Sequence, residues 1–224
     1  MNPLIFPKQT LSAASLYAVG SQYQVPTGKF PTGKAPTQII STWTGWKILI
    51  QVCARVRLRP FRYLDAMDLV CGLNDWQVAR WLASVPHPYR FDHAMDYLAR
   101  PEHLAVEAAL GDATAILAVA VTHDGSGIGG LGLVPSKRNE GARELGFWLS
   151  RPYWGQGIMP GAVIALIDEV TRQAPNTLIV ASANHDNIRS QRLIRSLGFS
   201  EDGHDEIFSN PLQRLVTTVC FRRA

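Results

Sequence analysis

Residues 144–157 have the sequence Glu-Leu-Gly-Phe-Trp-Leu-Ser-Arg-Pro-Tyr-Trp-Gly-Gln-Gly, and no other stretch says more about the fold. The mostly apolar run at 145–149 predicts a strand, while Gly155 and Gly157 predict a tight loop that opens a helix, with Pro160 in its first turn. Such a junction presents free backbone N–H groups at the positive end of a helix dipole, an arrangement that binds phosphate. The stretch therefore predicts a phosphate site; a glycine turn that serves only the backbone is the alternative.

The loop lacks the marks of two other phosphate-binding motifs. No Lys-Ser/Thr pair follows Gly157, as a Walker loop would require, and position 160 is proline where a dinucleotide fingerprint has its third glycine. A second motif lies thirty residues further on, Asn187-Ile-Arg-Ser190 followed by Leu197-Gly-Phe199. It predicts a helix that begins at the asparagine, ends at the glycine and returns as a strand.

Together the two motifs resemble the acetyl-CoA-binding half of the GNAT superfamily of N-acetyltransferases. Residues 144–149 and 153–158 are similar to the RimJ/RimL-like branch, which includes acetyltransferases of ribosomal-protein N-termini. The segments 55–61 and 74–82 resemble the opening of that branch, so the likeness covers roughly residues 53–224.

The resemblance implies an α/β (α+β) GNAT fold, with a mixed, mostly antiparallel, splayed sheet of six to seven strands flanked by about four helices. In the family, the strand that ends here at Leu149 parts from the strand at 177–183, and the pantetheine arm of acetyl-CoA lies in the gap. Two departures from the branch, Pro160-Gly161 in place of a Thr-Glu pair and Pro152 in place of a polar residue, leave the shape of the loop open. The residues expected to bind the acyl donor are Leu149, Ser150, Trp154, Gly155, Gln156, Gly157, Ile158, Met159 and Asn187.

The remaining pattern of apolar residues gives the order of the elements. On the helix expected at 160–173, the apolar side chains of Val163, Ile164, Ile167 and Val170 are expected on one face. The order predicts a mixed sheet covered by helices. Strands are expected at 55–61, 114–122, 127–134, 144–149, 177–183 and 212–221, with one more starting after Gly198, and helices at 65–73, 91–99, 160–173 and 187–197, with a short helical turn at 76–82.

Acetyl transfer to an amine requires a neutral nucleophile and a group that takes its proton. Glu144 is the candidate base, because it lies on the cofactor-binding strand, where some superfamily members place a carboxylate. A surface ion pair between Glu144 and an arginine is the alternative. The resemblance assigns the oxyanion of the tetrahedral intermediate to a backbone N–H near Leu149 or Ser150.

The departing thiolate also needs a proton, which many GNAT enzymes supply from a tyrosine seven positions after the asparagine. That position is Ile194 here. Ser190 is the candidate replacement, and part of the branch resembles this chain in placing a serine there. A role for Ser190 in capping or packing its own helix is the alternative. Asn187 is expected to fix the start of the helix and could hydrogen-bond the cofactor arm.

Other side chains offer weaker candidates. The aromatic residues Trp76, Trp81, Tyr89 and Trp148 could line an acceptor pocket or belong to the core. Arg192 and Arg195 could meet the phosphates of the cofactor or face water, and His185-Asp186 is expected to be a solvated loop pair.

Composition places one folded domain at 51–224 behind a Pro/Thr/Gly-rich extension at 1–50. The extension holds four lysines and no acidic residue, so it carries the whole net charge of +4, while 18 basic residues balance 18 acidic ones in the domain. A disordered extension is expected; a docking arm and a start codon placed too far upstream are alternatives. Because the domain has no surplus basic charge, nucleic-acid binding is not expected.

The same inventory bears on location and partners. No run of eighteen apolar residues occurs, no secretory signal is visible, and three scattered cysteines suit a reducing cytoplasm. We therefore expect a cytoplasmic, metal-free monomer or homodimer without membrane contact. The expected function is acetyl-CoA-dependent N-acetyltransfer to a primary amine, either a protein N-terminus or a small molecule, by direct attack on the thioester. An acyl-CoA-binding sensor or scaffold without turnover is the alternative.

Overall fold

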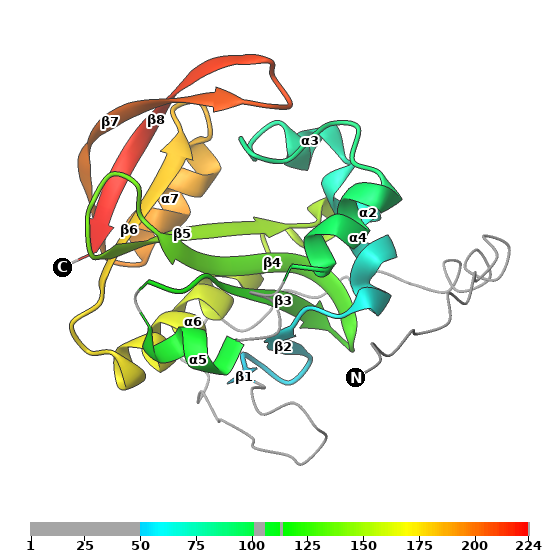
Figure 1. The fold of residues 1–224 in the computed structure, drawn as a ribbon, viewed down its shortest axis with the longest axis horizontal. Helices are drawn as coiled ribbons and strands as arrows, with labels where there is room; N and C mark the ends of the chain where they lie inside the picture. Colours follow the sequence, from blue (N-terminus) through cyan, green and yellow to red (C-terminus); the bar gives the residue numbers. More distant parts are fainter. Residues whose placement is uncertain (1–49, 101–105, 113, 224) are drawn as a thin grey trace, which may run out of the picture.

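The computed structural model describes residues 50–100, 106–112 and 114–223. Within them the chain forms one eight-stranded sheet in the order β1-β2-β3-β4-β5-β6-β8-β7 (Figure 1). Neighbouring strands are antiparallel except β5 and β6, which are parallel. The strands are β1 (Ile50–Gln51), β2 (Val56–Pro60), β3 (Leu117–His123), β4 (Ser126–Pro135), β5 (Ala142–Leu149), β6 (Leu178–Asn184), β7 (Phe199–Ser209) and β8 (Arg214–Arg223).

Helices cover both faces of this sheet (Figure 1). None of the helices in the described ranges is long and apolar enough to cross a membrane. The helices are α2 (Ala66–Leu73), α3 (Trp76–Ala79), α4 (Phe91–Leu98), α5 (Val106–Gly111), α6 (Ile158–Gln173) and α7 (Ile188–Ser196), with the 3-10 turns η1 (Tyr63–Asp65) and η3 (Arg151–Tyr153).

Alternation along β3 shows how the sheet separates two apolar clusters. Val119 and Val121 belong to the cluster that contains the buried side of α6, whereas Ala118 and Ala120 belong to the cluster that contains α2 and α4. Successive residues of a strand point to opposite faces, so α6 and the α2–α4 pair lie on opposite sides of the sheet. Each fully buried Leu or Ile side chain in these clusters contributes roughly 1.5–3 kcal/mol to folding.

The apolar face of α6 differs at one position from the expected one. Val163, Ile167 and Val170 are buried as expected, but Ile164 is 48% exposed. The buried stripe instead includes Met159 and is completed by Ala162, Ala165 and Leu166. Because successive helical residues are rotated by about 100°, Ile164 lies about 160° round the helix from Leu166, at the middle of the buried stripe, and so points away from the sheet.

The prediction of a mixed, mostly antiparallel sheet covered by helices is confirmed, with more elements than expected. The eighth strand is β1, which has only two residues and therefore no alternation to detect. The six α-helices of the described residues exceed the expected four or so, and the short α5 was not foreseen. Ile50, the last residue of the extension expected at 1–50, lies in β1 and is buried in the core, while residues 1–49 lie outside the described residues.

A buried arginine ties α5 to the sheet. Arg143 on β5 is fully buried, and its guanidinium donates to the carbonyls of Ala109, Ala115 and Leu133 at 2.9, 3.2 and 3.4 Å. Burial lowers the pKa of this guanidinium from its ordinary value. The guanidinium thereby links α5 and the loop before β3 to β4.

The strands β5 and β6 separate part-way along their length. Their pairing runs from Ala142↔Leu178 to Leu145↔Ala181 and then stops, although β5 continues to Leu149 and β6 to Asn184. The sheet is therefore splayed beyond Leu145, as expected, and this gap positions the site.

Candidate active site

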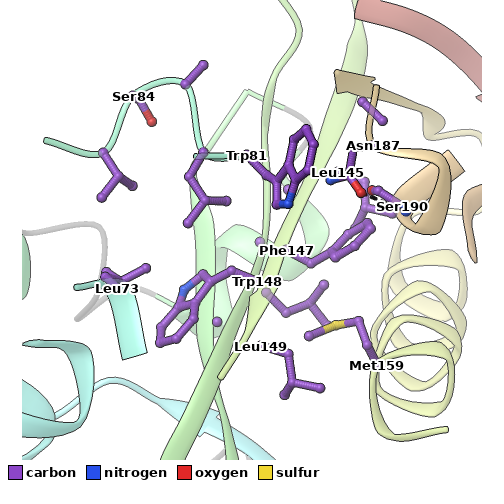
Figure 2. Close-up of a pocket in the computed structure, with 18 of the residues that line it drawn as sticks. Leu73, Trp81, Ser84, Leu145, Phe147, Trp148, Leu149, Met159, Asn187 and Ser190 are labelled. Atoms are coloured by element: carbon purple, nitrogen blue, oxygen red, sulfur yellow. Dashed lines mark hydrogen bonds between the residues drawn. The ribbon is translucent and has the colours of Figure 1, made fainter. Parts of the chain in front are cut away.

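A cleft of about 1380 Å³ opens where β5 and β6 separate. Figure 2 shows side chains entering it from several elements: Phe147 and Trp148 from β5, Met159 from α6, Ser190 from α7, and Trp81 from the loop after α3. Segments far apart in the sequence thus meet around one space.

The glycine loop lies at the mouth of this cleft and directly opens α6. Gly155 and Gly157 have φ values of 73° and 75°, a region that side chains disfavour, and Gly157 is the N-cap of α6. The helical ladder starts only with the Gly161 N–H, which donates to the Gly157 carbonyl at 3.3 Å. Within the described residues, the backbone N–H groups of 155–159 have no hydrogen-bond partner. They form a cluster of free donors at the positive end of a sixteen-residue helix.

Several side chains around the loop hold its shape. The Trp154 indole N–H donates to the Leu149 carbonyl at 2.6 Å, and the Arg189 guanidinium lies 4.5 Å from the centre of the Trp154 ring. The Gln156 amide donates to the Pro152 carbonyl at 2.8 Å. The side chain of Ile158 is buried in the core, and the mostly buried side chain of Met159 forms part of the cleft wall.

The free edge of β5 offers further backbone groups. The Ser150 N–H donates to the Ile128 carbonyl at 2.8 Å, so it is not free to hold an oxyanion. Because backbone groups alternate in direction along an antiparallel strand, the Phe147 and Leu149 N–H groups point away from β4, toward the gap. Of the two expected oxyanion donors, Leu149 is therefore the one left available. Phe147 was not foreseen, although the same alternation could have indicated it.

The Glu144 carboxylate faces the cleft and is held from β6. Its Oε1 accepts a hydrogen bond from the Ser182 hydroxyl at 2.6 Å. Within the described residues it forms no ion pair, and the neighbouring Arg143 points to the other face of the sheet. Ser182 is a site residue that sequence reasoning missed, since 38 positions separate it from Glu144.

The first turn of α7 supplies the remaining candidates. The Asn187 Oδ1 accepts from the Ser190 backbone N–H at 3.2 Å, so Asn187 caps the helix. The Ser190 hydroxyl lines the cleft and has no hydrogen-bond partner within the described ranges. Ile194 is fully buried in the core. The Gln191 amide, which was not foreseen, donates to the Asn184 and His185 carbonyls at 3.2 and 2.7 Å and so joins β6 to α7.

Comparison with known proteins decides the family of this chain. A family model described as an acetyltransferase (GNAT) domain matches residues 55–200. The chain belongs to the GNAT acetyltransferases.

Relatives of this GNAT chain are found both by sequence and by fold. It is 27% identical over 168 residues to the uncharacterized N-acetyltransferase p20 of Bacillus licheniformis, covering 75% of this chain and 91% of p20. The structure of apo RimL, a ribosomal L7/L12 alpha-N-protein acetyltransferase, is similar with a TM-score of 0.63 at 18% identity, covering 88% of this chain and 99% of that one. The microcin C7 self-immunity acetyltransferase MccE, solved with acetyl-CoA and AMP, has a TM-score of 0.65 at 15% identity, covering 78% and 95%.

The second half of the cleft in this GNAT domain is largely aromatic. Trp81, Tyr89 and Trp148 line it, whereas Trp76 does not and lies tilted against His87 with 5.0 Å between ring centres. Burial raises the pKa of Tyr89 to about 12, so its phenol is neutral at physiological pH. Tyr89 is only 5% exposed and belongs to the core cluster of α2 and α4, as the alternative had it, which leaves Trp81 and Trp148 as the aromatic candidates that face the cleft.

The arginines of α7 are placed differently from their expected role. Arg195 forms an ion pair with Glu201 at 2.8 Å, and neither Arg195 nor Arg192 lines the cleft. Arg189 lines it instead, over Trp154. At the end of β6, Asp186 also lines the cleft, while His185 stacks on His204 at 6.2 Å.

The far end of the cleft is spanned by the turn between β7 and β8. The Asn210 backbone N–H donates to the Ala83 carbonyl at 2.8 Å, and its side-chain amide donates to the Ser84 carbonyl at 3.2 Å. This turn and the loop after α3 meet in Figure 1 above the open end of the sheet. In the part of the chain that the structure describes, no group of three His, Cys, Asp or Glu residues could hold a metal ion.

Proposed function

We propose that this protein is an acetyl-CoA-dependent N-acetyltransferase that passes the acetyl group directly to a primary amine. The observation that carries the proposal is the coincidence of two features at one cleft. The pairing of β5 and β6 stops at Leu145↔Ala181, which leaves a free strand edge, and the cluster of free N–H donors at 155–159 lies at the mouth of the same gap. A free edge suits the amides of a pantetheine arm, and the donor cluster suits a pyrophosphate.

The residues proposed to bind acetyl-CoA act largely through their backbone. The N–H groups of Gly155, Gln156, Gly157, Ile158 and Met159 would hold the pyrophosphate, and the edge of β5 up to Leu149 would hold the arm. Trp154, through its indole, braces the end of β5 beside Ser150, and Asn187 sets the position of α7 on the opposite side of the gap. GNAT relatives such as MccE bind acetyl-CoA, which supports this assignment of the donor.

The proposed reaction forms a C–N bond and breaks the C–S bond of the thioester. The neutral amine attacks the thioester carbonyl, whose oxyanion accepts a hydrogen bond from the Leu149 N–H. Because Glu144 lies five residues before Leu149 on the same strand, it takes the proton of the amine through water, and then releases that proton to solvent. Collapse of the intermediate expels the thiolate, which takes a proton from the Ser190 hydroxyl; the hydroxyl regains a proton from solvent. The Ser182 hydrogen bond holds the Glu144 carboxylate at the cleft.

The aromatic half of the cleft is the proposed acceptor site. Its apolar walls at Trp81 and Trp148, and a lining in which basic side chains such as Arg80 balance acidic ones such as Asp96, favour an amine borne on an apolar or peptide-like body over a polycation. RimL acts on the N-terminus of a ribosomal protein, which makes a protein N-terminus one acceptor to test and a small amine the other.

The test is a turnover assay with acetyl-CoA and a panel of N-terminal peptides and small amines. Amine-dependent release of CoA thiol, with the acetylated amine identified by mass spectrometry, is expected. Binding of acetyl-CoA by calorimetry without amine-dependent release would instead favour the second candidate, an acyl-CoA sensor or scaffold. The observation that favours this second candidate is Ile194. It occupies the position where many GNAT enzymes have a tyrosine, it is buried, and it carries no proton donor.

A further inference from the structure

The strands β4 and β5 that floor the cleft contain several glycines, and most of them have a packing reason. A Cβ atom added at any of the four β4 glycines would come within about 3.2 Å of a neighbouring atom. The nearest atoms are the Asp68 Oδ2 at 3.2 Å for Gly127, the Trp148 carbonyl at 2.5 Å for Gly129, the Trp148 Nε1 at 2.4 Å for Gly130 and the Leu117 carbonyl at 2.6 Å for Gly132. Crowding therefore excludes a side chain at Gly129, Gly130 and Gly132, and it disfavours one at Gly127.

Crowding does not explain the glycine at position 146 on β5. A Cβ atom added there would meet nothing within 4 Å, and its φ is not in the positive range that demands glycine. Glycine inside a strand is less stable than alanine, because it loses more backbone entropy and packs no side chain. A strand glycine without a local cause often marks a place where a ligand approaches closely. The exposed backbone of Gly146 lines the cleft.

The space above Gly146 lies at the point where the two strands part. Gly146 is the first residue of β5 beyond the last pair, Leu145↔Ala181. Glu144 and Trp148 flank it two residues away on either side, and strand alternation puts all three on the same face. That face is opposite α6, because Trp148 packs with the α2–α4 cluster.

Both neighbours of this space are held in place. The Trp148 ring lies between Gly72 of α2 and Gly130 of β4, where an added Cβ would come within 2.5 and 2.4 Å of it. The Glu144 carboxylate accepts the hydrogen bond from Ser182. The space above Gly146 is therefore bounded by two side chains that are held in place, the Glu144 carboxylate at one end and the Trp148 indole at the other.

We propose that Gly146 is a specificity-determining residue: it leaves room for a substituent on the carbon that bears the acceptor amine. The inference rests on the proposed function, in which the amine lies between Leu149 and Glu144 at the edge of the splayed strands and reaches the Glu144 carboxylate through water. An amine in that place holds its own carbon over Gly146. The acceptor class is then primary amines on a substituted carbon, such as the α-amino group of a residue with a side chain.

Two matched amine pairs test this inference: benzylamine with α-methylbenzylamine, and a peptide beginning with glycine with the same peptide beginning with alanine. The wild-type enzyme should acetylate both members of at least one pair. Gly146→Ala should lower kcat/KM for the substituted member relative to the unsubstituted one by about tenfold or more, the usual range for excluding a single methyl group. Gly146→Val should lower both members.

Folding and donor binding are measured on the same proteins. A Cβ atom at position 146 meets no neighbour within 4 Å, so Gly146→Ala should have an unchanged or higher melting temperature and unchanged CoA affinity by calorimetry; Gly146→Val is compared with it only if it also retains its melting temperature. Gly111→Ala is the matched control, since its added Cβ has ample room and lies in α5, away from the cleft. This control should leave every measured value as in the wild type.

Each contrary result has a distinct meaning. An unchanged ratio in Gly146→Ala, or a wild-type enzyme that accepts only unsubstituted amines, would overturn the role of Gly146 while leaving acetyl transfer intact. Weaker CoA binding in Gly146→Ala would assign the space to the acyl donor and also overturn the inference. Absence of turnover with every amine, with CoA still bound, would overturn the proposed function itself.

Discussion

Replacing Gly157 with aspartate places a carboxylate at the N-cap of α6, beside the free N–H groups of 155–159. The cost to folding is expected to be small, because two effects oppose each other. The positive φ of 75° disfavours a side chain by about 1–2 kcal/mol, whereas a negative charge at a helix N-terminus returns about 0.3–1 kcal/mol. The free protein should therefore fold with a melting temperature close to that of the wild type.

The cost to cofactor binding is expected to be much larger. Two unit charges about 4 Å apart repel by roughly 4 kcal/mol at an effective dielectric constant near 20. Solvent at this exposed loop screens part of that repulsion, so we expect CoA affinity to fall by about tenfold to a thousandfold. Raising the salt concentration should narrow the difference in CoA affinity between Gly157→Asp and the wild type.

The measurement is calorimetric titration with CoA, and Gly157→Ala is the matched control. Alanine carries the same backbone penalty at φ 75° without the charge, so it separates strain from repulsion. Equal CoA affinity in the aspartate and alanine variants, both folded by circular dichroism, would show that the pyrophosphate does not bind at this loop.

Four further predictions follow from the same geometry. Ser190→Ala should lower kcat by about ten- to a thousandfold with CoA affinity unchanged by calorimetry, and full activity would exclude its hydroxyl as the proton donor. Glu144→Gln should depress the rate most at lower pH, where the amine is protonated and needs a base; a pH–rate profile parallel to the wild type would contradict this. A chain that starts at Thr42 keeps the buried Ile50 and should retain its melting temperature and CoA binding, whereas a loss of either would show that the extension packs on the domain. Arg143→Met should lower the free energy of unfolding by about 1–3 kcal/mol in urea titration, because the buried Ala109 carbonyl loses a charged donor and the link from α5 to β4 is lost; an unchanged free energy of unfolding would refute this role.

Features encoded locally could be predicted from the sequence. The glycines at 155 and 157 indicated a helix start with free donors because positive φ and helix opening are properties of neighbouring residues. Asn187 indicated a helix cap for the same reason. The order of strands and helices also followed from apolar spacing, apart from elements such as β1 and α5 that are too short to show a period.

Features that depend on distant residues could not be predicted in this way. The hydrogen bond between Ser182 and Glu144 requires the pairing register of β5 and β6, which no local pattern contains. The fixed position of Trp148 depends on glycines from two other elements. The hydrogen bond from the Ser150 N–H to the Ile128 carbonyl of β4, which removes Ser150 as an oxyanion donor, depends on the register of β4 and β5. Each of these three features arises from tertiary packing, because the local sequence is compatible with more than one arrangement of these side chains and backbone groups.

The two hydrogen bonds from Asn210 to Ala83 and Ser84 also limit what can enter the cleft. They join the β7–β8 turn to the loop after α3, so a molecule cannot be laid sideways across that end without breaking both. Under the proposed function, an acceptor that enters at this end would have to pass end-on, with its bulk left outside the bridge. A chain terminus or a slender amine would suit such an entrance better than an amine on the flank of a folded helix or sheet. The bridge between one hairpin turn and one loop would then select acceptors by shape as well as by chemistry.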